Sequence, residues 1–423
     1  MNASYHASHD GSRDGSWAAL PTHRDWLDTE AGRLLRFGAA ARDPRGGFAW
    51  LDSDGVPDPA HGVQLWITTR MAHVFALANL RGVPGAGPLA DHGLAALSGP
   101  LRDAEHGGWY SAIPGGDGPQ DGRKEAYGHA FVLLAASSLA VAGRPGAKGL
   151  LAEAAAVFER RFWDDERGWV RESFDREWTE PEAYLGANAN MHAVEAFLAA
   201  ADATGNGVWR TRALRIAEFF VHQVARAQWW RVPEHFAPNG RILPDYNEDA
   251  KDDPFRPYGT TPGHSLEWAR LLLNLEASLP DPPDWLADAA RWLFVVAVGA
   301  AWNRDGRPGF VYTIDGEGRP VVRERMHWVV AEAIAAAAAL HRRTGDLVYE
   351  HWYRVWWDYA AEFVADTRHG SWHHELDAEN RPSSTVWSGK PDIYHAYQAT
   401  LLPQLGLAPT AAAALHARLD GAS

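Results

Sequence analysis

Asp103-Ala-Glu-His-Gly-Gly-Trp109 is one copy of a turn that recurs along the chain. Its clear copies are Asp43-Pro-Arg-Gly-Gly-Phe48, Asp164-Asp-Glu-Arg-Gly-Trp169 and Asp366-Thr-Arg-His-Gly-Ser-Trp372, and its degenerate copies are Arg231-Val-Pro-Glu-His-Phe236 and Asn303-Arg-Asp-Gly-Arg-Pro-Gly-Phe310. The six turns start at positions 43, 103, 164, 231, 303 and 366, so they are separated by 60, 61, 67, 72 and 63 residues. A period of this kind indicates one supersecondary unit repeated six times.

Alanine- and leucine-rich runs with helical spacing flank every turn. The runs that follow the turns cover about 68–80, 125–141, 188–203, 262–278, 325–343 and 391–402. The runs that precede them cover about 22–40, 86–101, 147–163, 207–228, 284–301 and 346–365. We therefore predict twelve helices in six pairs, with each turn forming a short hairpin or an extended loop.

We expect the six pairs to close into a ring, which makes the fold all-α: an (α/α)6 barrel, or toroid. The helices that follow the turns would form the inner layer, with short β-hairpins and loops at the active-site end, where these helices begin. A closed ring leaves no repeat with an uncovered apolar side. An open helical solenoid is the alternative, but it would require atypical polar repeats at its ends, and the last pair here keeps its aromatic residues.

The repeat also predicts the domain organisation. A chain of 423 residues, 46% of them hydrophobic, would ordinarily suggest two or more domains. The six units instead predict one catalytic domain over residues 21–405. Residues 1–20 are expected to form a disordered tail, because their start is rich in Ser, His, Gly and Asp, and residues 406–423 to form a C-terminal tail.

Composition excludes several classes of protein. The net charge of −14 argues against nucleic acid as a partner. Charged residues interrupt the longest apolar stretches, so no membrane span is expected. The chain has no cysteine, which excludes disulfides and thiolate metal ligands. No secretory signal is recognisable, and we expect a cytoplasmic protein.

Histidines mark the beginning of every run that follows a turn. They are His73, His129, His192, His264, His327 and His395. In a closed ring, one histidine at the same phase of each repeat would point at a common centre. A shared site is therefore predicted, although any single histidine is more often structural.

The motifs around these histidines carry polar partners. His192 and Glu195, like His264 and Glu267, stand three residues apart, a spacing that puts both side chains on one face of a helix. The excess of tryptophan, 21 residues, suits the C–H faces of sugars in a concave site, although tryptophans also wedge between helices.

The inner-helix motifs resemble those of the N-acylglucosamine 2-epimerase superfamily, most closely its aldose–ketose isomerase branch. They are Thr69-Arg70, Asn188-x-Asn-Met-His192-x-x-Glu195, Pro262-Gly-His264-x-x-Glu267-Trp268 and Lys390-Pro-Asp-x-Tyr-His395, and the resemblance covers residues 22–402. It implies an (α/α)6 barrel that isomerises free sugars with no cofactor and no metal, as a monomer or a homodimer.

The resemblance also implies roles for individual residues. His264 and His395 would be the acid/base pair, with His192 assisting. The substrate contacts would be Arg70, Asn188, Glu267, Trp328, Gln398 and Asp392. Met326-His327-Trp328 stands where relatives acting on N-acyl sugars often have a Trp-Trp pair, which disfavours an N-acyl substrate. D-Mannose, giving D-fructose, is the expected substrate, with D-lyxose a further one.

The chemistry agrees with these residue types. Isomerisation through an enediol needs groups that accept and donate a proton near neutral pH, and histidine does so with a free pKa of about 6.5. Activity is therefore expected to fall on the acid side at about pH 6–7. The alternatives are a sugar 2-epimerase, a sulfoquinovose isomerase, a toroidal glycoside hydrolase with two carboxylates, a histidine metal site, or a sugar-binding protein without catalysis.

Overall fold

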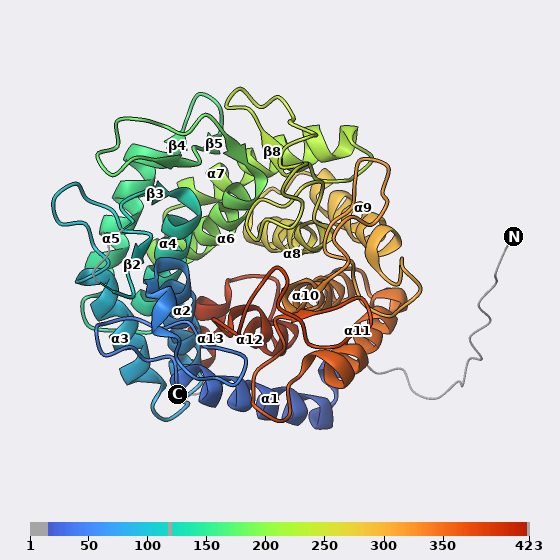
Figure 1. Cartoon of the computed structure of the whole chain (residues 1–423), viewed down its shortest axis with the longest axis horizontal. Coiled ribbons are helices and arrows are strands. Elements are labelled where there is room, and N and C mark those ends of the chain that lie inside the picture. Colours follow the sequence, from blue (N-terminus) through green and yellow to red (C-terminus); the bar gives the residue numbers. More distant parts are fainter. Residues whose placement is uncertain (1–15, 117–120, 421–423) are drawn as a thin grey trace, which may run out of the picture.

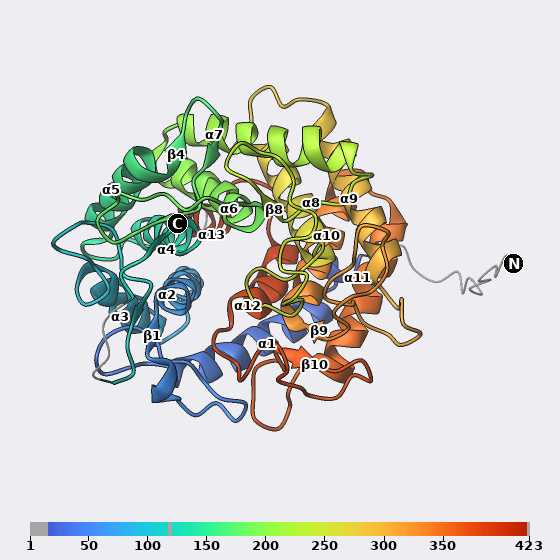
Figure 2. The same ribbon diagram turned by 45° about the horizontal axis from the view of Figure 1, so that its top comes forward.

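Six helices stand around a common centre in the computed structural model of the chain, which describes residues 16–116 and 121–420 (Figure 1). Each packs against the next, and the last packs against the first, so the ring is closed. These inner helices are α2 (Leu65–Leu80), α4 (Ala126–Val141), α6 (Ala187–Thr204), α8 (Pro262–Ser278), α10 (His327–Thr344) and α12 (Tyr394–Leu401). Figure 2 shows them from an oblique direction.

An outer layer surrounds this ring. It consists of α1 (Pro21–Ala39), α3 (Ala86–Ser98), α5 (Ala147–Val157), α7 (Val208–Ala217), α9 (Trp285–Ala301) and α11 (Leu347–Tyr359). Each inner helix packs against the outer helix that follows it in the chain, and α12 packs against α1. Short π-helical segments extend three outer helices: η3 (Phe158–Phe162), η4 (Glu218–Ala225) and η5 (Ala360–Val364). The predicted all-α toroid of six helix pairs is confirmed.

The two layers differ in the residues that they bury. Helix α2 is buried along almost its whole length, as expected for a helix that is apolar on every side. Helix α11 instead buries one stripe, formed by Tyr349, Tyr353, Trp356 and Trp357, at the i, i+4, i+7 spacing of an amphipathic helix. The sequence pattern therefore assigns each helix to its layer.

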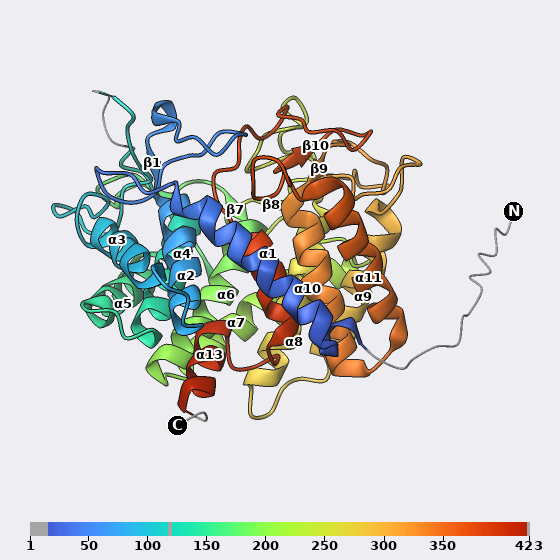
Figure 3. The ribbon, with the colours of Figure 1, turned by 90° about the horizontal axis from the view of Figure 1, so that it is seen from below.

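Short antiparallel strand pairs join neighbouring units at the end where the inner helices begin (Figure 3). They are β1 (Val63–Gln64) with β2 (Ala112–Ile113), β3 (Lys124–Glu125) with β6 (Ser173–Phe174), β7 (Leu185–Gly186) with β8 (His235–Phe236), and β9 (Arg325–Met326) with β10 (Glu375–Leu376). Strands β4 (Trp163–Asp164) and β5 (Trp169–Val170) form a hairpin within one unit. The backbone N–H of Lys390 donates to the carbonyl of Leu51 at 2.8 Å, which links the last unit to the first.

Carboxylates of the repeated turns hold the residues that precede the inner helices. Lys124 lies 2.9 Å from Asp103, and both side chains are fully buried. Lys390 lies 2.5 Å from Asp366 and thereby fixes the segment that leads into α12. The turns thus position the first residues of the inner helices.

The described segments nearest the two termini pack against different parts of the toroid. Of the predicted N-terminal tail, residues 1–15 lie outside the described residues, and η1 (Trp17–Ala19) is tied to α11 by a 2.7 Å hydrogen bond from the Trp17 N–H to Glu350. The predicted C-terminal tail contains α13 (Ala411–Asp420), which packs against α2, α4 and α6 at the end opposite the strand pairs (Figure 3). The remaining short helices are η2 (Pro59–His61) and η6 (Leu402–Gln404). Among the described residues, no helix has the length and apolar character needed to cross a membrane.

Candidate active site

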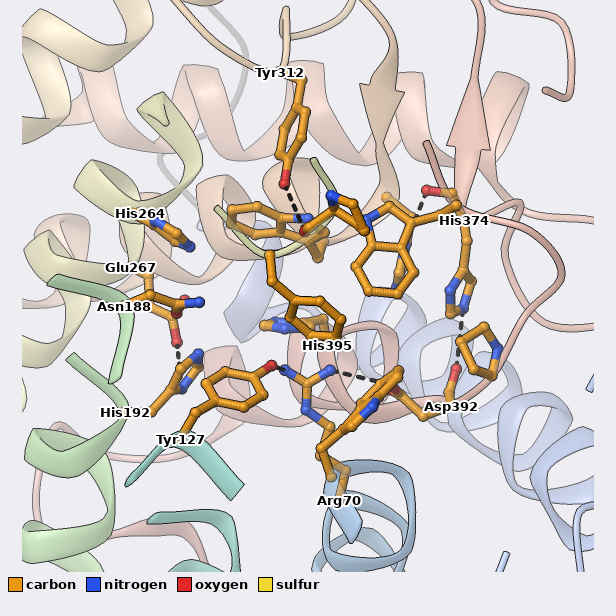
Figure 4. Close-up of a pocket in the computed structure, with 17 residues that line it drawn as sticks. Arg70, Tyr127, Asn188, His192, His264, Glu267, Tyr312, His374, Asp392 and His395 are labelled. Carbon is orange, nitrogen blue, oxygen red and sulfur yellow. Dashed lines mark hydrogen bonds and ion pairs between the residues drawn. The ribbon is translucent and has the colours of Figure 1, made fainter. Parts of the chain in front are cut away.

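A pocket opens at the centre of the ring, at the end that carries the strand pairs. Its wall is made by residues from all six inner helices and from the loops above them (Figure 4). The lining residues are Trp66, Arg70, Tyr127, Asn188, His192, Pro254, Phe255, His264, Glu267, Tyr312, His327, Trp328, His374, Trp387, Pro391, Asp392 and His395.

His264 lies in the first turn of α8, which begins at Pro262. Its Nδ1 atom is 2.9 Å and 3.0 Å from the two carboxylate oxygens of Glu234, and Glu234 also accepts the backbone N–H of Thr261 at 3.1 Å. Because a carboxylate can only accept, Nδ1 carries the proton of this bond. In a neutral ring, Nε2 then has a free lone pair, and the side chain points into the pocket (Figure 4).

His395 has the same arrangement on α12. Its Nδ1 atom is 3.0 Å from Oε1 of Glu332, while Arg270 Nε donates to the other oxygen of Glu332 at 2.9 Å. Burial, followed by the positive charge of Arg70, holds the pKa of His395 well below the usual 6.5. The ring is therefore neutral at physiological pH, with Nε2 available as a base.

His192 differs from these two histidines. Its Nδ1 atom lies 3.8 Å from both Glu195 and Glu267, too far for a hydrogen bond, and it has no hydrogen-bond partner among the described residues. Burial lowers the pKa of His192 to about 4. Because the Nδ1 atom of this neutral imidazole has no partner, the ring can rotate to present either nitrogen to a bound molecule.

Arg70 supplies a fixed cation. Its Nη1 donates to Asp392 at 3.1 Å and its Nη2 donates to the Tyr127 hydroxyl at 2.8 Å (Figure 4). Asp392 also accepts the backbone N–H of Tyr394 at 2.7 Å, so the carboxylate is itself fixed. The guanidinium lies 4.5 Å from the ring centroid of Phe131. A cation held in this way can stabilise negative charge that develops on a sugar oxygen.

Glu267 lies one turn after His264 and is almost completely buried. Burial, followed by the charge of Glu332, raises the pKa of Glu267 well above its usual value. A protonated carboxyl at this position can donate a hydrogen bond into the pocket.

A metal ion is a further possibility for part of this cluster. The ligand atoms of His192, Glu195 and Glu267 lie within 4.8 Å of one another. However, Arg270 Nη2 already lies 3.4 Å from Glu267 and 3.8 Å from Glu195. A divalent cation would face this guanidinium at close range, so we assign no metal ligands here.

The structure brings most of the predicted site residues together. The pocket is lined by His264, His395, His192, Arg70, Asn188, Glu267, Trp328 and Asp392. Gln398 is the exception, since it is three residues after His395 and lies deeper along α12. Its Nε2 donates to Glu195 at 3.4 Å, and it lines a second cavity toward the opposite end of the ring. The prediction of Gln398 as a pocket contact is therefore corrected.

The prediction that all six histidines share one phase is wrong. They occupy the first position of α10, the second of α12, the third of α8, the fourth of α4, the sixth of α6 and the ninth of α2. His129 instead accepts the Trp109 N–H at 3.2 Å below a turn, and His73 bonds the Ser138 hydroxyl at 2.7 Å. Neither lines the pocket, because a helix rotates about 100° per residue and carries these side chains to other depths and faces.

Sequence reasoning missed several pocket residues. Phe255 comes from the long segment between η4 and α8, which has no periodicity, and its ring lies 6.2 Å from Trp66 and 5.1 Å from Trp387, centroid to centroid. His374 stacks on His327 at 3.8 Å. The other missed lining residues are Tyr127, Pro254, Tyr312 and Pro391. Glu234, the partner of His264, was missed because the chain separates the two by 30 residues.

Comparisons with known proteins agree with this geometry. The sequence model of the N-acylglucosamine 2-epimerase (GlcNAc 2-epimerase) family matches residues 46–399. A protein of Thermobifida fusca named D-mannose isomerase is 62% identical over 400 residues, which cover 94% of this chain and 98% of that protein. A D-mannose isomerase of Pseudomonas cannabina pv. alisalensis is 52% identical, over 95% of this chain and 97% of its own. A crystal structure of D-mannose isomerase matches with a TM-score of 0.84 at 29% identity, covering 93% of this chain and 99% of that one.

Proposed function

The chain belongs to the N-acylglucosamine 2-epimerase family, and from this premise we propose that it is an enzyme that isomerises D-mannose to D-fructose. The observation that carries the proposal is the pair of carboxylate-held histidines, His264 and His395, in one pocket. The relatives named D-mannose isomerase support the choice of sugar, because they match almost the full length of the chain at 62% and 52% identity.

The proton transfer is assigned to His395. Its Nε2 takes the proton from C2 of the open-chain aldose, which leaves a cis-enediol, and returns a proton to C1 on the same face. One proton moves from O2 to O1 in the same conversion, so that aldose and ketose have the same composition. A neutral ring whose Nδ1–H is held by Glu332 suits this role, since the base needs a lone pair at the start of each turnover.

The proton transfers at the sugar oxygens, and the stabilisation of the charge on them, are assigned to the remaining polar groups. His264 handles the protons of O1 and O2, and His192 assists in opening the sugar ring. Arg70 stabilises charge on the enediolate oxygens, and Glu267, when it is protonated, donates a hydrogen bond to one of them. Asn188 and Asp392 bind hydroxyl groups, and Trp328 offers an apolar face to the sugar; all of these residues line the pocket.

The alternative functions fit the pocket less well. A glycoside hydrolase needs two carboxylates flanking a bond, whereas Asp392 is paired with Arg70 and Glu267 lies against Arg270. Sulfoquinovose carries a sulfonate, and Arg70 is the only Lys or Arg among the described lining residues. A 2-epimerase would return the proton to the other face of C2, for which His264 would have to act as a second base.

The test is incubation with D-mannose in deuterium oxide, followed by NMR. We expect fructose as the dominant early product, labelled at C1 to the extent that the shuttled proton exchanges with solvent. Glucose that appears first, labelled at C2, would show that the enzyme is an epimerase. Prior treatment with a chelator should leave the rate unchanged, and loss of activity that zinc or manganese restores would contradict the cofactor-free proposal.

The setting of the enzyme is also proposed. We propose that it acts on free monosaccharide in the cytoplasm, as a monomer or a homodimer, with residues 21–405 as its catalytic domain. Light scattering of the purified chain measures the oligomeric state.

A further inference from the structure

Arg270 lies below the pocket and does not line it. It stands on α8, one turn after Glu267, and it is almost completely buried. Its guanidinium lies among three carboxylates from three helices: 2.9 Å from Glu332 on α10, 3.4 Å from Glu267 on α8, and 3.8 Å from Glu195 on α6.

Glu332 connects Arg270 to His395. One oxygen of the Glu332 carboxylate accepts from Arg270 Nε, and the other is 3.0 Å from Nδ1 of His395. The carboxylate is thus fixed at both ends. While it is ionised it can only accept a hydrogen bond, which keeps the proton on Nδ1 of His395.

We propose that Arg270 is a positioning residue that keeps Glu332 ionised and thereby holds His395 in the tautomer whose Nε2 is a base. The inference rests on the proposed role of His395 in the isomerisation. Arg270 acts through Glu332 and touches no substrate.

The electrostatics of the cluster support this role. Burial raises the pKa of Glu332, and the charge and hydrogen bond of Arg270 are the largest influences that lower it. Around the pair of Glu332 and Arg270 lie groups from three helices: His192 and Glu195 on α6, Glu267 on α8, and Tyr394 and His395 on α12. Arg70 on α2 is a second fixed cation, which acts on Glu267 and His395, whereas Arg270 is the cation that acts on Glu332.

Removal of Arg270 has a defined consequence. Without its charge, the pKa of Glu332 rises further, and the carboxyl holds its proton at neutral pH. A protonated Glu332 donates to Nδ1 of His395, and the ring proton then moves to Nε2. The lone pair that takes the C2 proton is lost, although the substrate contacts in the pocket remain. Activity should return only at a pH high enough to ionise Glu332.

The experiment compares the wild-type chain, Arg270→Met and Arg270→Lys as functions of pH. The sequence predicts an acid limb at about pH 6–7 from the free histidine, but burial lowers the pKa of His395, so the wild-type rate should begin to fall only below pH 6.5. In Arg270→Met we expect kcat at pH 7 to fall by about 100-fold, the lower end of what a general base contributes. KM should change little. The acid limb of the pH–rate profile should move up by more than about two pH units, because a 100-fold loss at pH 7 requires that about 99% of Glu332 is protonated there. Arg270→Lys keeps the positive charge, so the acid limb of its pH–rate profile should lie close to that of the wild type.

A readout that does not depend on activity accompanies the rates. In ¹⁵N-histidine spectra, the signal of His395, assigned by its loss in His395→Gln, should report a proton on Nδ1 in the wild type and on Nε2 in Arg270→Met. An unmoved acid limb together with an unchanged tautomer overturns the proposal. A wild-type chain that does not isomerise mannose overturns the proposed function instead, while the tautomer still tests Arg270.

Matched variants separate positioning from folding. Lys124→Met removes another buried cation, which pairs with Asp103 outside the pocket. We expect it to lower the melting temperature without moving the acid limb, and a limb that moves equally in this variant contradicts a specific role for Arg270. If Arg270→Met does not fold, Arg270→Gln carries the same test with a polar side chain.

Discussion

At the scale of single residues, the two histidines assigned to catalysis are oriented by carboxylates that the chain brings from elsewhere. Glu234 precedes His264 by 30 residues and Glu332 precedes His395 by 63. Both bonds fix Nδ1, so both rings present Nε2 to the same pocket. The geometry therefore explains why His264 and His395, and not the other histidines of the inner helices, are assigned to the acid/base pair.

Replacement of either histidine should abolish turnover without unfolding the chain. His264→Gln and His395→Gln remove the ring that accepts and donates the proton, and each should reduce kcat by at least about 100-fold. The measurement is the initial rate of fructose formation, with circular dichroism as the check on folding. His73→Gln is the matched control, because His73 is buried on α2 outside the pocket, and it should retain activity. A folded His395→Gln protein with a tenth of the wild-type rate would remove that residue from the mechanism.

At the scale of elements, the sequence predicts what depends on local pattern. The turns at Asp103 and Asp366 and the apolar runs beside them predicted the twelve helices of the ring, because turn chemistry and helical periodicity are local properties. The depth at which a side chain lies inside the ring does not follow from the local sequence pattern. The sequence pattern groups His73 and His129 with the other histidines because they begin similar runs, but they stand nine and four residues into their helices. Phe255 was missed because an aperiodic segment carries it over the pocket.

The contact between α8 and α10 gives a prediction at this scale. A Cβ atom at Gly263 would lie 2.6 Å from the Trp328 ring and 2.7 Å from Val329. Gly263→Ala should therefore displace Trp328 or His264, whose rings are 5.0 Å apart. We expect a loss of about 1–3 kcal/mol in the free energy of unfolding, as for other overpacked sites, together with a lower kcat/KM. Denaturant titration and mannose kinetics measure the two effects.

Gly299 on α9 is the matched control for this substitution. No atom lies within 4 Å of a Cβ at that position. Gly299→Ala should raise the stability by up to about 1 kcal/mol, through helix propensity alone, and leave the kinetics unchanged. An equal response of the two glycine variants would contradict the steric argument.

At the scale of the whole molecule, the closed ring gives a buried interior that contains many neutral imidazoles. Among the described residues, the pKa is lowered, with burial as the main cause, in nine histidines: His23, His73, His129, His192, His235, His327, His373, His374 and His395. Burial raises the pKa of four glutamates: Glu125, Glu172, Glu267 and Glu332. These two groups act on stability in opposite directions as the pH falls.

The chain should lose stability on acidification below pH 6.5. In the unfolded chain a histidine takes up a proton near pH 6.5, whereas in the folded chain His129 stays neutral down to about pH 3 and His327 to about pH 4. Each such histidine favours unfolding by about 1.4 kcal/mol per pH unit below 6.5. The four glutamates oppose this loss, since they hold protons in the folded state, but the histidines outnumber them. We therefore expect the melting temperature to be lower at pH 5.5 than at pH 7.5.

His129→Gln tests the cause of this acid sensitivity outside the pocket. Its ring accepts the Trp109 N–H through Nε2 and bonds the Glu125 carbonyl through Nδ1. The oxygen and the NH₂ of a glutamine amide can accept and donate in the same way, but the amide does not titrate. The variant should therefore lose less stability than the wild type between pH 7.5 and 5.5, as measured by calorimetry. A wild-type melting temperature that stays constant or rises over this interval would show that the buried glutamates outweigh the histidines.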